Sequence, residues 1–135
     1  MKFRAARVLV PGSCEGKILH LEADMSFWGA VDPLNGRVID RRHPQFGKSL
    51  EGRIILLRRS IGSSSGSAIL LELLQRGCGP AGIILAEPDQ ILTLGAVVAR
   101  EMGYASIPVL QLDSDDFGKL RGYMSVMEDG AIAAK

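Results

Sequence analysis

Three short, largely apolar segments alternate with two helical patterns in the second half of the sequence, and this alternation restricts the possible folds more than any other feature. The apolar segments are residues 53–57, 82–86 and 107–112, and the helical patterns between them are 67–76 and 89–102. The segments are apolar on both faces, as strands are when other layers cover each side of a sheet. Strands that alternate with helices form parallel sheets. We therefore predict a βαβαβ parallel sheet over this half of the chain.

Glycines mark the expected ends of both helical patterns. Gly77 follows the first pattern and Gly103 follows the second, and glycine commonly occupies the position after the last helical turn. A third, short helix is expected over residues 114–121. Segments 123–127 and 131–133 indicate a closing hairpin or an extended tail.

The first fifty residues carry short β-type patterns that turn residues interrupt. We expect strands at 5–11 and 16–23, and a short strand at 37–40 after an Asn-Gly turn. Residues 26–33 form a short apolar piece that ends in a turn. This β-rich N-terminal half would pack beside the parallel sheet or extend it, which gives an α/β fold.

Composition narrows the possible functions. The 135 residues suit one domain, 1–135, with 47% apolar residues, 23% charged residues and a net charge of +1. This charge gives no reason to propose nucleic acid or an acidic membrane as a partner, and no apolar run is long enough to span a membrane. Two distant cysteines, Cys14 and Cys78, are typical of a reducing cytoplasm. With His20 and His43 they show no metal-binding spacing, so we expect no metal on this chain.

A Gly/Ser loop joins the first strand of the parallel unit to its helix, with the sequence SIGSSSGS over residues 60–67. Functional loops of parallel sheets lie at the carboxyl ends of strands, and the start of a helix attracts anions. A serine hydroxyl in this loop either binds an anion or is itself held as an alkoxide. The plain alternative is a helix cap in a flexible loop. Arg58 and Arg59 directly precede the loop, and their guanidinium groups are candidates for holding an anion.

No common catalytic motif coincides with this loop. It lacks the lysine of a nucleotide-binding Walker loop and the spacing of the dinucleotide-binding and serine-hydrolase motifs. The acidic residues are scattered, and solvated loop positions are the default interpretation for them. The pair Arg41 and Arg42 is interpreted as solvated surface. Trp28, the only tryptophan, either packs in the core or contacts a partner or a substrate.

Six linked segments of the sequence resemble the swivel domain of aconitase X. Their order and spacing match over about residues 5–120. The segments are SFWGAVDP at 26–33, GRVID at 36–40, HP at 43–44, GRIIL at 52–56, GSSS at 62–65 and GPAGIIL at 79–85. The resemblance implies a swivelling β/β/α domain, akin to the mobile domain of aconitase and isopropylmalate isomerase.

The same resemblance implies a role for the loop. In those enzymes a glycine-serine-serine turn presents an alkoxide-like serine, the base that removes a proton next to a carboxylate. Gly62, Ser63 and Ser64 match that turn, so Ser63 is the expected base and its neighbours are expected to bind substrate. A shift of one residue would make Ser64 or Ser65 the base instead. The better-known aconitases carry an arginine after the two serines, and Ser65 stands there in this chain, so substrate recognition is expected from a larger partner or from the arginine pair before the loop.

A large partner is also implied. In that family a large catalytic domain carries an iron centre, often iron–sulfur, on its own cysteines, and this sequence lacks that domain. The chain is therefore expected to be the cytoplasmic small subunit of a two-subunit dehydratase that is inactive alone and acts on a small carboxylate. Family members dehydrate cis-3-hydroxy-L-proline or phosphomevalonate, and residues 27–29 and 41–44 look closer to the bacterial hydroxyproline group. A non-catalytic anion-binding or regulatory module is the other interpretation of the loop.

Overall fold

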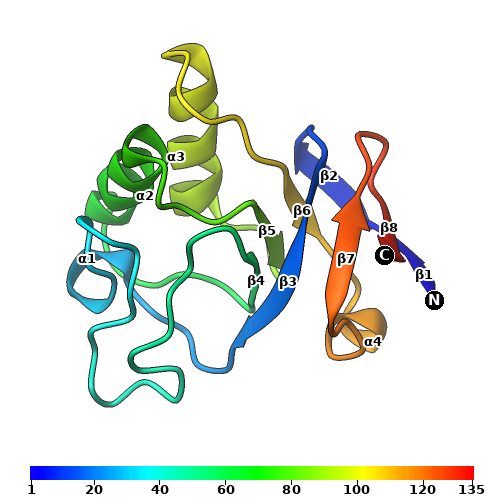
Figure 1. Cartoon of the computed structure of the whole chain (residues 1–135), viewed down its shortest axis with the longest axis horizontal. Helices are drawn as coiled ribbons and strands as arrows, with labels where there is room; N and C mark the ends of the chain where they lie inside the picture. Colours follow the sequence, from blue (N-terminus) through cyan, green and yellow to red (C-terminus); the bar gives the residue numbers. More distant parts are fainter.

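The computed structural model describes residues 1–135 and contains eight strands and four helices (Figure 1). The strands are β1 (Lys2–Arg4), β2 (Arg7–Val10), β3 (Cys14–Leu21), β4 (Ile54–Leu57), β5 (Gly82–Leu85), β6 (Val109–Gln111), β7 (Tyr123–Val126) and β8 (Ala131–Ala134). The helices are α1 (Phe27–Ala30), α2 (Ser65–Arg76), α3 (Gln90–Glu101) and α4 (Ser114–Phe117). None of the helices combines the length and the apolar character needed to cross a membrane.

The strands follow the order β1-β8-β7-β3-β4-β5-β6-β2. Strands β3, β4, β5 and β6 are parallel to one another, whereas β2, β7, β8 and β1 add to this centre in antiparallel fashion. The predicted parallel sheet of βαβ units is confirmed. Strand β3 links the two kinds of pairing, because its first half pairs with β7 and its second half with β4.

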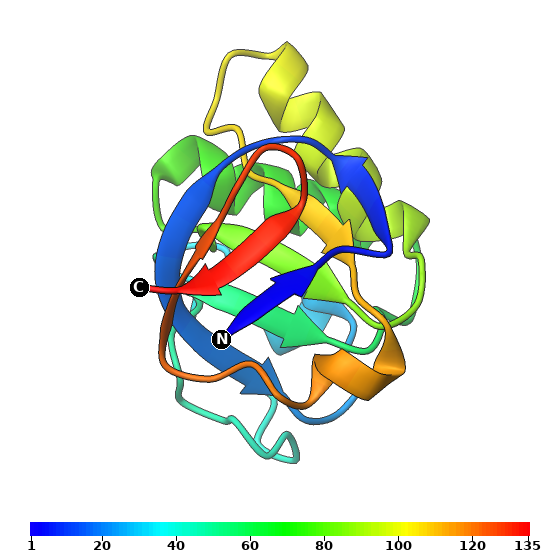
Figure 2. The same cartoon turned by 90° about the vertical axis from the view of Figure 1, so that its right-hand side faces the viewer.

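The two ends of this strand order are brought together by two consecutive alanines. The backbone N–H of Ala5 donates to the carbonyl of Gly130 (2.9 Å), and that of Ala6 donates to the carbonyl of Gln111 (2.8 Å). The chain thus passes from β1 beside β8 directly to β2 beside β6, and the strands wrap around a common interior (Figure 2). This wrapping produces the first two layers of the β/β/α arrangement.

Alternate residues of the central strands face two separate cores. On β4, Ile54 and Leu56 lie in a cluster enclosed by the wrapped strands, while Ile55 and Leu57 lie in a larger cluster under the helices. All four are fully buried. Since successive side chains of a strand point to opposite faces, a strand that is apolar at every position needs cover on both sides. Helices α2 and α3 form the third layer, and their buried side chains share the larger core cluster with those of the parallel strands (Figure 1).

Several predicted boundaries differ from the structure. The short strand expected at 37–40 is not formed, and only isolated bridges join residues 37 and 38 to neighbouring segments. Side-chain-capped turns dominate this region, since Asp32 accepts the N–H of Leu34 and Asn35 accepts that of Arg37 (both 2.9 Å). These local hydrogen bonds compete with strand pairing. The strand expected at 16–23 runs instead from 14 to 21.

The terminal regions also contain corrections. The predicted strand 5–11 is shorter, as β2, and the preceding strand β1 was not expected. The helix expected over 114–121 stops at Phe117 because Gly118 follows, and glycine is a poor helix former. The closing segments form the hairpin of β7 and β8, the first of the two predicted alternatives.

Candidate active site

The Gly/Ser loop leaves the middle of the parallel strands. It begins after Leu57 at the carboxyl end of β4 and ends at Ser65, the first residue of α2. Strand β4 has parallel neighbours on both sides, β3 and β5. The predicted strand, loop and helix are confirmed. The loop lies at the carboxyl ends of the parallel strands, where such folds bind ligands.

Ser63 closes a tight turn at the start of α2. Its Oγ accepts the backbone N–H of Ser65 (3.3 Å), and its carbonyl accepts that of Gly66 (3.2 Å). The backbone N–H groups of Gly62, Ser63 and Ser64 have no acceptor within the chain. All three residues are exposed. Unpaired N–H groups at the positive end of a helix favour negative charge on an oxygen held among them.

Gly62 adopts a backbone conformation that other residues avoid, with a φ of +97°. A Cβ built there would lie 2.8 Å from the Oγ of Ser26. The loop therefore needs glycine for two reasons: the positive φ, and the close approach of the segment that leads into α1.

We expect Gly62→Ala to destabilise the fold by about 2–4 kcal/mol, combining the left-handed conformation with overpacking against Ser26. Gly47→Ala is the matched control, because Gly47 has a φ of +85° with nothing within 4 Å of a built Cβ. Urea unfolding of both variants isolates the contribution of the contact. Adding Ser26→Ala should restore part of the loss in Gly62→Ala, and equal losses in the two single variants would contradict the role given to this contact.

Asp89 attaches the beginning of the loop to α3. Its side chain is buried, with the residue 7% exposed. One carboxylate oxygen, Oδ1, accepts the backbone N–H groups of Ile91 (2.9 Å) and Leu92 (3.1 Å), which caps α3. The other, Oδ2, accepts the N–H of Ser60. Treating Asp89 as a scattered, solvated acid was wrong, because one buried carboxylate connects the loop to a neighbouring helix.

Asparagine at position 89 separates the two functions of this carboxylate. Asp89→Asn keeps an oxygen that caps α3 but turns an amide N–H toward the N–H of Ser60. We therefore expect the free energy of unfolding to fall by about 1–3 kcal/mol, and to fall further in Asp89→Ala. Amide hydrogen exchange should accelerate at Ser60 before it accelerates in α3. The control is Asp113→Asn, since Asp113 precedes α4 without a side-chain cap hydrogen bond. Unchanged exchange at Ser60 would refute the anchoring role.

Arg58 and Arg59 form ion pairs with carboxylates beside the loop. Arg58 contacts both Asp24 and Glu87, with 2.9 Å between its Nη1 and Oε2 of Glu87. The Nε of Arg59 lies 3.3 Å from Oδ2 of Asp24. Both guanidinium groups are therefore already engaged. Their predicted role in holding a substrate anion stays a prediction, and so do the roles of Gly62, Ser63, Ser64 and Ser65.

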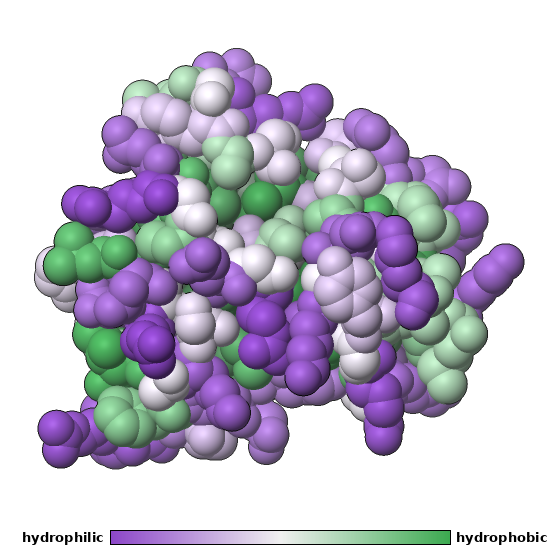
Figure 3. Space-filling view, in the orientation of Figure 1, coloured by the Kyte–Doolittle hydropathy of each residue, from purple (hydrophilic) through white to green (hydrophobic).

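The side chain of Trp28 is exposed to solvent beside the Gly/Ser loop. The four residues of α1 include two with non-helical backbone angles, Trp28 and Gly29. This kink directs Phe27 into the core, where it is 1% exposed, whereas Trp28 is 65% exposed. Core packing of the indole is thus wrong, and a surface role is left for it. Apolar side chains gather on the left of Figure 3, over α1 and the loop that follows it.

No group of three or more histidine, cysteine, aspartate or glutamate side chains is placed to hold a metal ion. Burial raises the pKa of the Cys14 thiol to about 12, so it is protonated at neutral pH. His43 is buried between hydrogen-bonding partners, with its Nδ1 accepting the N–H of Gln45 (3.0 Å) and its Nε2 3.2 Å from the carbonyl of Ala23. The two ring nitrogens of His43 thus hold the local structure around it.

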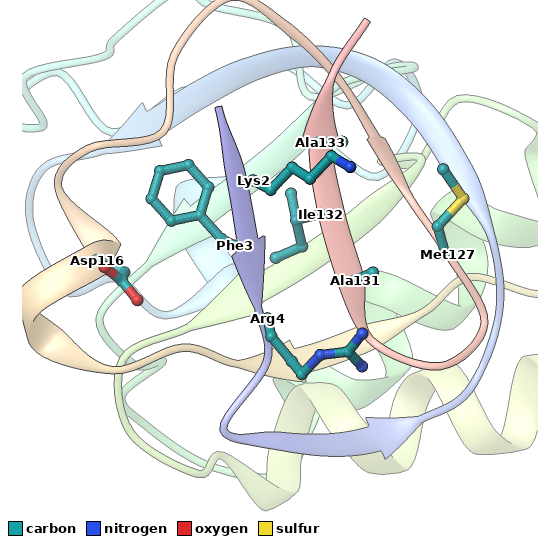
Figure 4. A pocket seen from close by; sticks show the side chains of 8 residues that line it. All are labelled: Lys2, Phe3, Arg4, Asp116, Met127, Ala131, Ile132 and Ala133. Carbon is teal, nitrogen blue, oxygen red and sulfur yellow. The ribbon is translucent and has the colours of Figure 1, made fainter.

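A hollow lies between β1, β8 and the segments around them, far from the Gly/Ser loop (Figures 1 and 4). Phe3 and Ile132 form much of its apolar lining, and Lys2, Arg4 and Asp116 contribute charge. Arg4 pairs with Asp129 (3.6 Å). The lining contains no serine, cysteine or histidine, and none of the predicted site residues lies in it.

Comparison with known proteins identifies the family. A family model described as the aconitase X swivel domain matches residues 4–133. The chain belongs to the aconitase X swivel-domain family. The structure agrees, because a crystal structure of Thermococcus kodakaraensis aconitase X in its holo-form superposes with a TM-score of 0.84 at 30% identity, covering 98% of this chain and 96% of that one.

Two curated relatives show which proteins carry such a swivel domain. A cis-3-hydroxy-L-proline dehydratase of Pseudomonas aeruginosa is 46% identical over 117 residues, which are 87% of this chain and 20% of the relative. A phosphomevalonate dehydratase small subunit of Methanothermobacter thermautotrophicus is 35% identical over 124 residues, 91% of this chain and 90% of the relative. The chain spans about a fifth of the length of the first relative and nearly all of the second.

Proposed function

We propose that this aconitase X swivel domain is the small subunit of a dehydratase that removes water from cis-3-hydroxy-L-proline. The higher identity to the hydroxyproline enzyme of Pseudomonas aeruginosa supports this substrate. The near-complete coverage of an archaeal small subunit supports a partner that supplies the rest of the enzyme. The proposal places the complex in the cytoplasm, because two free cysteines suit a reducing compartment.

The observation that carries the proposal is the turn at the start of α2. The Oγ of Ser63 receives the N–H of Ser65, and the adjacent N–H groups of Gly62 and Ser64 have no acceptor within the chain. A hydroxyl loses its proton near neutral pH only where donors and positive charge stabilise the oxyanion. This turn supplies both at the exposed edge of the sheet, where a substrate on a partner is able to reach it.

In the proposed reaction the Ser63 alkoxide removes the proton from the substrate carbon that carries the carboxylate. The electron pair left on that carbon forms a double bond to the neighbouring carbon, and the hydroxyl there leaves and takes up a proton as water. Ser63 is neutral after the first step and returns a proton to solvent before the next turnover. The residues of this chain do not fit an iron centre, so departure of the hydroxyl is assigned to groups outside this chain.

Phosphomevalonate is the second candidate substrate. The archaeal small subunit named for it in Methanothermobacter thermautotrophicus matches this chain along 90% of its own length. Proton removal by Ser63 would be the same with either substrate. Only the groups that recognise the rest of the molecule would differ.

Purification of the tagged chain from its own cells without oxygen tests the proposal first. We expect a large partner to co-purify with bound iron, and the complex to dehydrate cis-3-hydroxy-L-proline in preference to phosphomevalonate when both are assayed in parallel. The opposite preference would replace the substrate while keeping the mechanism. A metal-free chain without a partner or turnover would instead support the anion-binding module and refute the dehydratase.

A further inference from the structure

We propose that a pocket beside the Gly/Ser loop binds the anionic end of the substrate, and that Arg41 is the residue of this chain that holds it. The inference rests on the proposed function and extends it to recognition. The residues that line the pocket, called the Arg41 pocket below, include Asp24, Ser26, Trp28, Ile39, Asp40, Arg41, Arg42 and Ile61. Its ligand class is a small carboxylate or phosphate with a short apolar carbon skeleton.

The Arg41 pocket borders the expected base directly. Ile61, which lines it, immediately precedes Gly62, and its backbone N–H donates to the carbonyl of Met25 (3.0 Å). Ser26, on the same wall, lies against Gly62, where a built Cβ would meet its Oγ at 2.8 Å. Consecutive Cα atoms are about 3.8 Å apart, so the Cα of Ser63 is within about 7.6 Å of that of Ile61. A small molecule in the pocket thus lies within reach of Ser63.

Charge distribution selects Arg41 among the arginines nearby. Arg58 and Arg59 are paired with Asp24, and Arg58 also with Glu87. Arg42 lies 3.5 Å from Asp40. Arg41 has neither an ion pair nor a side-chain hydrogen bond within the chain.

The carboxylates around the pocket do not cancel this charge. Asp24 faces two arginines, and Asp40 accepts the backbone N–H of Arg42 (3.0 Å). That hydrogen bond, with the nearby Arg42 charge, lowers the pKa of Asp40, so Asp40 is ionised and engaged at neutral pH. The charged residues that line the pocket are Arg41, Arg42, Asp24 and Asp40, and of these four only Arg41 has no ion-pair partner. The guanidinium group of Arg41 is therefore available to pair with an anion.

Apolar side chains in the Arg41 pocket suit the carbon skeleton of such a ligand. Trp28, Ile39 and Ile61 are 65%, 45% and 44% exposed. These side chains come from three separate stretches of chain, and tertiary folding alone brings them together. An arginine beside apolar walls fixes the orientation of a small anion, as in many small-molecule sites. Arg41 would thereby supply the positive charge that the better-known aconitases place after the two serines, where this chain has Ser65.

Steady-state kinetics of the complex with its large partner provide the first test. We expect Arg41→Ala to raise KM by about 10- to 100-fold, through loss of a hydrogen-bonded charge, while kcat falls less than about threefold. Arg41→Lys should raise KM less than Arg41→Ala does, because lysine keeps the positive charge but lacks the planar guanidinium group. Arg100→Ala removes an exposed arginine from α3 and is the control. An unchanged KM in Arg41→Ala would overturn the inference.

Titration of the 135-residue chain alone separates this inference from the proposed function. We expect inorganic phosphate and L-proline to shift the NMR signals of the Trp28 indole N–H and the Ile61 amide in the unmodified chain, and not in Arg41→Ala. Shifts at these signals without turnover by any complex would keep the pocket and refute the dehydratase. Turnover with no shift at either signal would refute the pocket and keep the dehydratase.

Discussion

Alanine in place of Ser63 should lower kcat of the assembled dehydratase by about 10²- to 10⁴-fold, the usual contribution of a positioned general base. The side chain is exposed, so its loss leaves no buried cavity and the fold of the subunit should be unaffected. The hydrogen bond that the Ser65 N–H makes to Oγ of Ser63 (3.3 Å) would also be lost, at a small cost to the first turn of α2. Kinetics with saturating substrate, together with circular dichroism of the free subunit, measure the two effects.

The neighbouring serines are the matched controls for this experiment. Ser64 and Ser65 are also exposed, and neither side chain forms a cap hydrogen bond at the start of α2. Ser64→Ala and Ser65→Ala should therefore retain far more turnover than Ser63→Ala. If Ser64→Ala or Ser65→Ala were the inactive variant, the base would be that serine. Full activity in all three variants would remove the serine base from the mechanism.

The largest effect on stability should come from Leu57→Ala. Leu57 ends β4 directly before the loop, is 0% exposed and packs in the core under the helices. Removing its side chain leaves a cavity where neighbouring atoms relax only in part, so we expect a loss of about 2–5 kcal/mol in the free energy of unfolding. Urea denaturation followed by circular dichroism gives this value directly.

Leu94→Ala provides the comparison, since the same atoms are removed from α3 at a side chain that is 52% exposed. We expect a loss of less than about 1 kcal/mol there. At temperatures where the Leu57→Ala subunit remains folded, its complex with the large partner should still be active, although the Gly/Ser loop would be positioned less precisely. Equal destabilisation by the two variants would contradict the assignment of Leu57 to the core.

Local patterns in the sequence were sufficient for the elements in the second half of the chain. Helices α2 and α3 begin and end within two residues of the predicted bounds, because the apolar spacing and the glycines at 77 and 103 both act over one or two turns. The same holds for β4 and β5, whose residues are apolar at nearly every position. The position of the serine loop between β4 and α2 followed from these signals.

Contacts between segments far apart in the sequence could not be predicted from such local patterns. Strand β1 is three residues long and acquires its pairing only from β8, at the other end of the sequence. The anchoring of Ser60 by Asp89 joins residues 29 apart, and the ion pair between Arg58 and Asp24 joins residues 34 apart. No periodicity encodes such pairs. The helix-capping role of Asp89 could nevertheless have been predicted, because Asp89 directly precedes a helical pattern, where aspartate is a favoured N-cap residue.

Patterns among residues close together in the chain were enough to predict the parallel unit, the place of the Gly/Ser loop at the start of α2, and the resemblance to the aconitase X swivel domain. Which arginines form ion pairs, how exposed Trp28 is, and that Ile61, Trp28 and Arg41 line one pocket beside the loop became clear from the folded structure alone. Charge pairing and burial depend on distances in space, and the packing of all the layers sets those distances together.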